Sequence, residues 1–179
     1  MNLPNKLTLL RICLIPVFIA CFYIDVTWKL YLAAGVFFLA YMTDILDGQI
    51  ARRQKIVTDF GKLMDPIADK LLTSSALVML VGVGLLSPIP AFIIIAREFI
   101  ISGFRLVSAG NGKVIAASWL GKTKTITQCT AIIILLLDEL VVAIFGFPLG
   151  TVAVWVSVSF TVWSGVDYII KNKGAVSFK

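Results

Sequence analysis

Six long apolar runs dominate the sequence. A helix needs about 20 residues to cross about 30 Å of hydrocarbon, and each run is close to that length. They cover residues 7–24, 29–51, 68–86, 88–108, 123–142 and 151–170. The pattern predicts an all-α fold, a bundle of six transmembrane helices that forms a single domain over residues 1–179.

Composition agrees with an integral membrane protein. The chain is 59% hydrophobic and 15% charged, with a mean hydropathy of +0.98, whereas soluble domains carry about 25% charged residues. There is no histidine. Its absence excludes histidine-based acid–base chemistry, serine–histidine triads and histidine-ligated zinc.

Charge is distributed unevenly among the connections. The short links after the first, third and fifth runs, taken with the adjoining ends of the runs, hold one basic residue, Lys29, beside Asp25, Asp138 and Glu139. The other Lys and Arg residues lie in the links 52–62 and 109–122, in the termini, or in helix parts placed toward them. Since basic residues favour the cytoplasm, both termini and both long links are predicted to be cytoplasmic. The net charge of +6 therefore has a membrane explanation, and we expect no nucleic-acid partner.

Four carboxylates stand within or beside this apolar pattern: Asp44, Asp47, Asp65 and Asp69. The first two are three residues apart and the last two are four apart, so each pair shares a helix face. An ionised Asp near the bilayer centre costs about 2.5–3.5 kcal/mol on insertion scales. Carboxylate oxygens suit hard divalent cations. The cluster therefore predicts a metal site, in which bound cations offset the cost of placing carboxylates near the membrane.

Small and basic residues surround the carboxylates. Gly48 and Ala51 would let a ligand approach the helix backbone, and Arg52 offers forked donors suited to a phosphate. Gly61 lies in the predicted connecting loop, where close packing or a special backbone angle is expected. A simpler interpretation is that the four carboxylates only cap helices and pair with loop cations.

The segment 44–69 follows the pattern D-x2-D-G-x2-A-R-x8-G-x3-D-x3-D. This pattern resembles the signature of the CDP-alcohol phosphatidyltransferase family, and every defined position is met. The resemblance implies that two divalent ions, Mg2+ or Mn2+, are held by Asp44, Asp47, Asp65 and Asp69. It implies that Asp69 is also the general base for the acceptor hydroxyl, and that Gly48, Ala51, Arg52 and Gly61 line the cytidine and pyrophosphate site.

The resemblance also implies a reaction in which a phosphatidyl group passes from CDP-diacylglycerol to an alcohol and CMP leaves. Two metal ions suit this chemistry because they neutralise charge on the entering and leaving oxygens. Transfer at phosphorus depends on positioning and electrostatic stabilisation more than on a covalent nucleophile. The family further implies a homodimer in the cell membrane, among membrane lipids, with its active site facing the cytoplasm.

A second cluster is cationic. It comprises residues on or beside the fourth and fifth runs: Arg97, Arg105, Lys122 and Lys124. Their convergence would suit an anionic acceptor, most simply a phosphomonoester with a free hydroxyl. The segments REFIISGFR and GKTKT, and the opening MNLPNKLTLLRI, resemble the glycerol-phosphate branch of the family. That branch implies sn-glycerol 3-phosphate as the acceptor, with Asn5, Thr8 and Arg11 lining the nucleotide or head-group side of the cavity.

Alternatives stay open for several of these residues. Asn5 and Thr8 could equally cap a helix, Arg97 could only pair with Glu98, and Lys124 could be an interfacial anchor. Within the family, inositol phosphate, phosphatidylglycerol or serine are other possible acceptors. Outside it, a transporter could use intramembrane carboxylates, but the acids cluster at one membrane edge and no repeat appears. A further alternative is a structural or scaffold membrane protein, in which the acidic residues lie at the surface without a catalytic or binding role.

Overall fold

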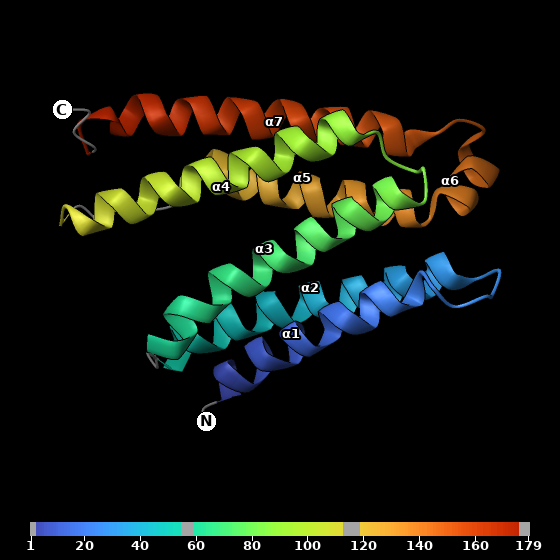
Figure 1. Cartoon of the computed structure of the whole chain (residues 1–179), viewed down its shortest axis with the longest axis horizontal. Helices are drawn as coiled ribbons and strands as arrows, with labels where there is room; N and C mark the ends of the chain where they lie inside the picture. Colours follow the sequence, from blue (N-terminus) through green and yellow to red (C-terminus); the bar gives the residue numbers. More distant parts are fainter. Residues whose placement is uncertain (1–2, 55–58, 113–118, 176–179) are drawn as a thin grey trace. The chain divides into compact units, whose positions relative to one another are not determined.

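The computed structural model describes residues 3–54, 59–112 and 119–175, and every element in those ranges is helical (Figure 1). The helices are α1 Leu3–Cys21, α2 Lys29–Gln54, α3 Asp59–Gly82, α4 Pro88–Gly110, α5 Trp119–Leu136, α6 Asp138–Phe145 and α7 Leu149–Asn172, followed by a short 3-10 turn over Lys173–Ala175. An all-α fold is therefore confirmed for this part of the chain. The helices follow the apolar runs because an α-helix satisfies its own backbone hydrogen bonds in an apolar environment.

The predicted start of the third helix at residue 68 was wrong. Helix α3 begins at Asp59 and continues through Pro66 and both of its later aspartates. The prediction followed the hydropathy boundary, but a helix does not need apolar side chains to continue. Gly61 consequently lies inside α3 and not in a connecting loop, which corrects the second prediction made for this segment.

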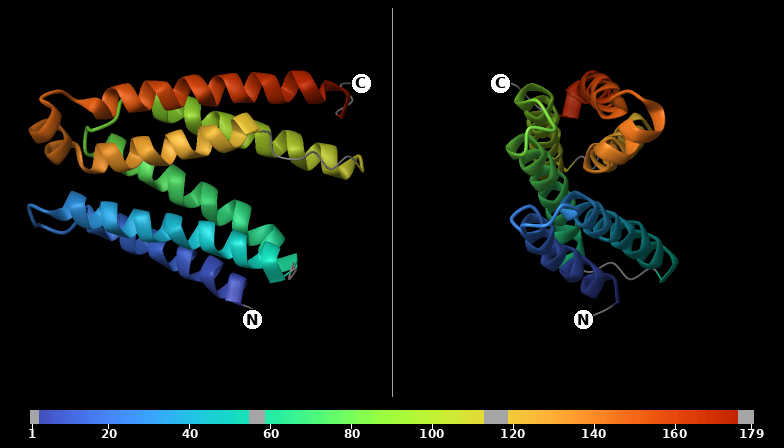
Figure 2. Two further views of the ribbon diagram at one scale, coloured as in Figure 1. Left: turned by 180° about the vertical axis from the view of Figure 1, so that it is seen from behind. Right: turned by 90° about the vertical axis from the view of Figure 1, so that its right-hand side faces the viewer.

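One continuous helix over residues 123–142 was also a wrong prediction. Helix α5 ends at Leu136, and α6 leaves it at an angle of 84° (Figure 2). Asp138 and Glu139 occupy the first turn of α6, where carboxylates interact favourably with the helix dipole. Gly146 ends α6 in the left-handed conformation at φ 73°, which a glycine adopts without steric cost.

Several helices have the character of membrane spans. Among the described residues, Lys29–Leu46 of α2 and the whole of α7 are long and apolar enough to cross a bilayer, and the bent pair α5–α6 is a third candidate if it forms one span. Helix α4 carries Arg97, Glu98 and Arg105 within its apolar length. Large apolar side chains such as Phe92, Leu106 and Trp163 are exposed, as expected of surfaces that meet lipid. The chain is a helical membrane protein; the number of spans and the sidedness stay predictions.

The chain divides into two compact units, and the first covers Met1–Val83. Its helix α1 packs against both α2 and α3. Phe18 of α1 is fully buried, with its ring centroid 5.2 Å from that of Phe22 and 5.9 Å from that of Phe37 of α2. Figure 1 shows the start of α1, the end of α2 and the start of α3 at the same end of this unit. That end holds the acidic segment.

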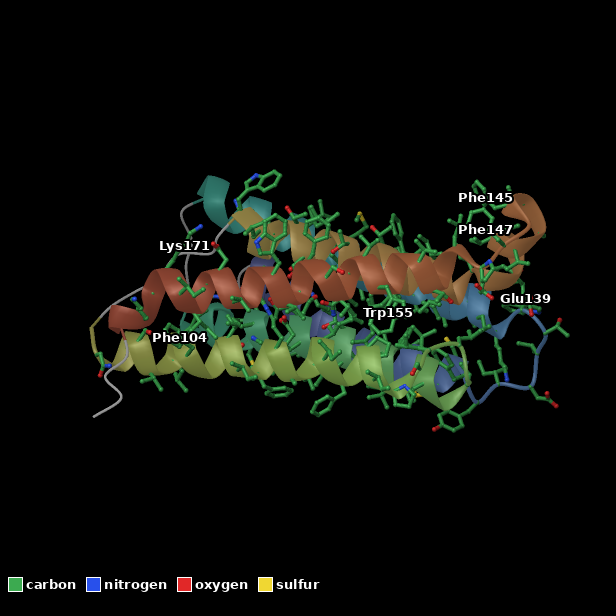
Figure 3. All side chains as sticks on the ribbon, turned by 90° about the horizontal axis from the view of Figure 1, so that it is seen from above. Phe104, Glu139, Phe145, Phe147, Trp155 and Lys171 are labelled. Atoms are coloured by element: carbon green, nitrogen blue, oxygen red, sulfur yellow. The ribbon has the colours of Figure 1, made fainter. Side chains whose placement is uncertain are left out.

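The second unit covers Gly84–Lys179, and in it α7 lies alongside both α4 and α5 (Figure 2). Gly150 allows the close approach of α7 to α5, because a Cβ there would lie 2.6 Å from Leu135 Cδ2. Figure 3 shows Glu139, Phe145 and Phe147 at one end of this unit and Lys171 at the other. The acidic and basic ends of the second unit are thus separated along its helices.

Candidate functional site

In the first unit, α1 presents three buried polar side chains, those of Asn5, Thr8 and Arg11. They are spaced three residues apart, so they lie along one face of the helix. Arg11 is fully buried, and its Nη1 lies 2.8 Å from Asp44 Oδ1 of α2. Thr8 Oγ1 donates a hydrogen bond of 2.6 Å to Asp65 Oδ1 of α3. Helix α1 therefore orients one carboxylate from each of the other two helices.

The two oriented carboxylates approach one another. Asp44 interacts electrostatically with Asp65 as well as with Arg11. Asp69 lies one turn after Asp65 on the same face of α3 and is partly buried. Its backbone carbonyl accepts a hydrogen bond of 3.0 Å from Thr73 Oγ1. Like charges gathered at a partly buried place repel one another, and such a site favours cations.

The rest of the acidic motif is described only in part. Asp47, Gly48, Ala51 and Arg52 lie on α2 beyond Asp44, but their side chains are outside the described residues. Gly61 is buried within α3, which fits close packing at that position.

The described acidic side chains do not by themselves form a metal site. Among the side chains that the structure describes, no three or more Asp, Glu, Cys or His groups are arranged to hold a metal. The side chain of Asp47 lies outside the described residues. The chemistry of the site still fits a hard cation, because the converging donors are carboxylate oxygens from α2 and α3. Metal binding is accordingly a proposal about the four aspartates.

The second unit contains a different charged cluster. Glu98 Oε1 lies 3.0 Å from Arg97 Nη1 and 2.5 Å from Lys124 Nζ of α5. Arg97 Nη2 also donates a hydrogen bond of 2.9 Å to Ser164 Oγ of α7. The side chains of Arg97, Glu98 and Lys124 are 15%, 14% and 4% exposed. Three helices therefore meet around one carboxylate and two cations.

Helix α7 also supplies a packing surface for Arg97. A Cβ added to Gly165 would lie 3.2 Å from Arg97 Cγ and 3.5 Å from its Nε. The separation of 3.2 Å from Cγ is tighter than an ordinary van der Waals contact. The guanidinium thus rests against glycine, while Ser164, itself hydrogen-bonded to the Thr161 carbonyl, receives one of its N–H groups.

The structure brings together only two of the four cations in the predicted acceptor site. Arg97 and Lys124 share Glu98, whereas the side chains of Arg105 and Lys122 are exposed. Lys122 and Lys124 are two residues apart on α5 and so project to different sides of the helix. The alternative that Arg97 pairs with Glu98 is confirmed as a contact, and Lys124 is buried in that same network.

Sequence reasoning missed several partners. Ser164 and Gly165 are not among the predicted site residues, and Glu98 is predicted only as a counter-ion for Arg97. The spacing of Ser157, Thr161, Ser164 and Tyr168 is a signal that could have revealed this face, because all four are buried on one side of α7. The pairing of Arg11 with Asp44 had no local signal, since it joins distant parts of the sequence.

A model of the CDP-alcohol phosphatidyltransferase family matches residues 1–163, which include the whole acidic motif. The chain belongs to the CDP-alcohol phosphatidyltransferase family. Among its relatives, a CDP-diacylglycerol–glycerol-3-phosphate 3-phosphatidyltransferase of Bacillus subtilis is 45% identical, over 96% of this chain and 95% of that protein. Proteins of the same name from Rickettsia bellii and Shigella flexneri are 42% and 38% identical, each over 93% of its own length. The family resemblance of the acidic motif is thereby confirmed, and the similarity extends over nearly the whole chain.

Proposed function

We propose that this phosphatidyltransferase moves the phosphatidyl group of CDP-diacylglycerol to sn-glycerol 3-phosphate. The products are phosphatidylglycerophosphate and CMP, and the reaction belongs to phospholipid biosynthesis. One observation carries the proposal: relatives 38–45% identical over nearly their full lengths bear the name of this activity. The acidic cluster in the first unit supplies the matching chemistry.

In this proposal, Asp44, Asp47, Asp65 and Asp69 hold two divalent ions, Mg2+ or Mn2+. When bound, such ions neutralise charge on the diphosphate oxygens of the donor. The support from the structure is the convergence of Asp44 and Asp65, with Arg11 and Thr8 each fixing one oxygen. Fixing these oxygens reduces the reorganisation needed when a ligand binds.

Asp69 is proposed as the general base that removes the proton from the acceptor hydroxyl. The chain has no histidine, so a carboxylate is the natural group for this step. Asp69 is only partly buried and lies on the same face of α3 as Asp65. Gly48, Ala51, Arg52 and Gly61, with Asn5 and Thr8, are proposed to line the nucleotide site.

The acceptor phosphate is proposed to bind the cations of the second unit: Arg97, Arg105, Lys122 and Lys124. Arg97 and Lys124 have the stronger support, because they are held together with one counter-charge between them. A guanidinium and an ammonium are groups that suit a phosphomonoester. The exposed Arg105 and Lys122 would act as outer contacts.

The proposed protein is a single domain with six membrane spans and cytoplasmic termini, active as a homodimer in the cell membrane. In the second unit, Lys171 and Glu139 lie at opposite ends (Figure 3), as the bias of basic residues toward the cytoplasm would require. The active site would open to the cytoplasm, where the soluble acceptor is available.

The test is CMP release by the purified protein in detergent, supplied with CDP-diacylglycerol, Mg2+ and one acceptor at a time. We expect release with sn-glycerol 3-phosphate and little with inositol phosphate, serine or phosphatidylglycerol. Release with only one of the other acceptors would retain the family chemistry and contradict the proposed acceptor. No release with any of them would contradict the proposed function.

A further inference from the structure

The carboxylate of Glu98 occupies an unusual place between two cations in apolar helices. One oxygen, Oε1, contacts both Arg97 Nη1 and Lys124 Nζ. Among the side chains that the structure describes at this place, two cations share one carboxylate in largely buried surroundings. A buried charge of this kind is costly unless a ligand or another group compensates it.

The contacts fix the geometry of both cations. Arg97 is held at Nη1 by Glu98, at Nη2 by Ser164, and along its stem by the open surface of Gly165. Lys124 comes from another helix and is joined to Arg97 through the shared carboxylate. Glu98 is thus the link that sets the separation of the two positive groups.

We infer that Glu98 is a positioning residue, which together with Ser164 and Gly165 holds Arg97 and Lys124 as a preformed site for a phosphomonoester. The inference rests on the proposed function, in which these cations bind the acceptor phosphate. It adds that the site depends on a negatively charged residue, although the ligand is also negative. Preorganisation explains this, because two cations held in place lose less side-chain entropy when they bind an anion.

The decisive variant is Glu98→Gln, which keeps the size of the side chain and removes its charge. If Glu98 only weakened the positive field, its removal would make the site more cationic and lower KM for glycerol 3-phosphate. If Glu98 positions the cations, that KM rises, by about tenfold, while KM for CDP-diacylglycerol changes less than about twofold. The two accounts therefore predict opposite signs.

Two further variants keep the test valid if Glu98→Gln does not fold. Gly165→Ala leaves every charge in place but puts a methyl group against the Arg97 stem, and Ser164→Ala removes one hydrogen bond from its guanidinium. Each should raise KM for glycerol 3-phosphate by about threefold or more and leave the donor KM unchanged.

Glu98→Asp keeps the charge, so its KM for glycerol 3-phosphate should lie between those of wild type and Glu98→Gln. The control is Asp167→Asn, which removes a carboxylate from the exposed pair with Lys171 on the same helix.

The outcomes separate the two proposals. A wild-type protein that does not release CMP with glycerol 3-phosphate contradicts the proposed function, and this inference with it. A wild-type protein that is active, with an acceptor KM unchanged or lowered in Glu98→Gln or unchanged in Gly165→Ala and Ser164→Ala, contradicts the inference alone. Equal changes in the acceptor and donor KM values would also overturn it, because they indicate a general structural role.

Discussion

Both units place charged side chains within apolar helices, where unpaired charge is costly. Their described clusters differ in whether carboxylates or cations are the more numerous charged groups. In the first unit, Asp44 pairs with the buried cation Arg11 and interacts electrostatically with a second carboxylate, Asp65. In the second, two cations, Arg97 and Lys124, gather around one carboxylate, Glu98. Among these described side chains, carboxylates outnumber cations in the first cluster and cations outnumber carboxylates in the second.

The sign of the excess indicates what each cluster can bind. An acidic excess made of carboxylate oxygens favours hard cations, and a basic excess made of guanidinium and ammonium groups favours phosphate. A transfer between a diphosphate donor and a phosphate-bearing acceptor needs both kinds of site. The comparison therefore connects the proposed reaction to two separate features of the chain, and each can be perturbed independently.

The largest effect is expected from Asp65→Asn. The change removes negative charge from the first cluster but keeps a hydrogen-bond acceptor for Thr8. We expect CMP release to fall by about 10³-fold or more, since metal ions contribute several kcal/mol to such reactions. The control is Asp25→Asn, at an exposed carboxylate in the link between α1 and α2. Activity within about twofold of wild type in Asp65→Asn would remove the first cluster from the mechanism.

Asp69→Asn should affect turnover more than binding. Loss of a general base lowers kcat by about 10²-fold or more, whereas KM for CDP-diacylglycerol should stay close to the wild-type value. Steady-state kinetics with each substrate varied in turn would separate these constants. A kcat near that of wild type would refute the role of Asp69 as the base.

A smaller effect is expected from Arg97→Lys in the second cluster. Lysine keeps the charge but cannot contact both Glu98 and Ser164 through a planar fork. We expect KM for glycerol 3-phosphate to rise by about tenfold, because hydrogen bonds to charged groups contribute about 1.5–3 kcal/mol. Lys171→Arg, at an exposed position of α7, is the matched control. A rise in the donor KM instead would mean that the acceptor site is misplaced.

The smallest effect is expected from Thr8→Val, which removes the hydroxyl that orients Asp65. One neutral donor to a carboxylate should change activity by about fivefold to tenfold. Thr8→Ser keeps the hydroxyl and should retain most of the activity. If Thr8→Val and Thr8→Ser behave alike, the hydrogen bond does not contribute to the site.

Hydropathy predicted the helices where apolar character and helix ends coincide. Helices α2, α4 and α7 lie close to the predicted runs 29–51, 88–108 and 151–170. It failed at α3, where the helix continues into polar sequence, and at Leu137, where an apolar run contains a break. Apolar character alone cannot locate such ends, because they depend on backbone geometry and on the charges near the helix dipole.

The candidate site was predictable to a similar extent. The carboxylates were found because charge is rare in apolar segments and their spacing is fixed. The partners Arg11, Ser164 and Gly165 were not assigned to their contacts, since these depend on packing between helices distant in the sequence. Arg105 and Lys122 share the charge of Arg97 and Lys124 but are exposed, and charge by itself does not specify which side of a helix meets its neighbour.

The most direct test of the account is CMP release with glycerol 3-phosphate before and after removal of divalent ions by a chelator. The account predicts that release is lost in excess chelator and returns when Mg2+ or Mn2+ is added beyond the chelator concentration. Full release in excess chelator would contradict the claim that the acidic cluster of the first unit acts by holding metal ions.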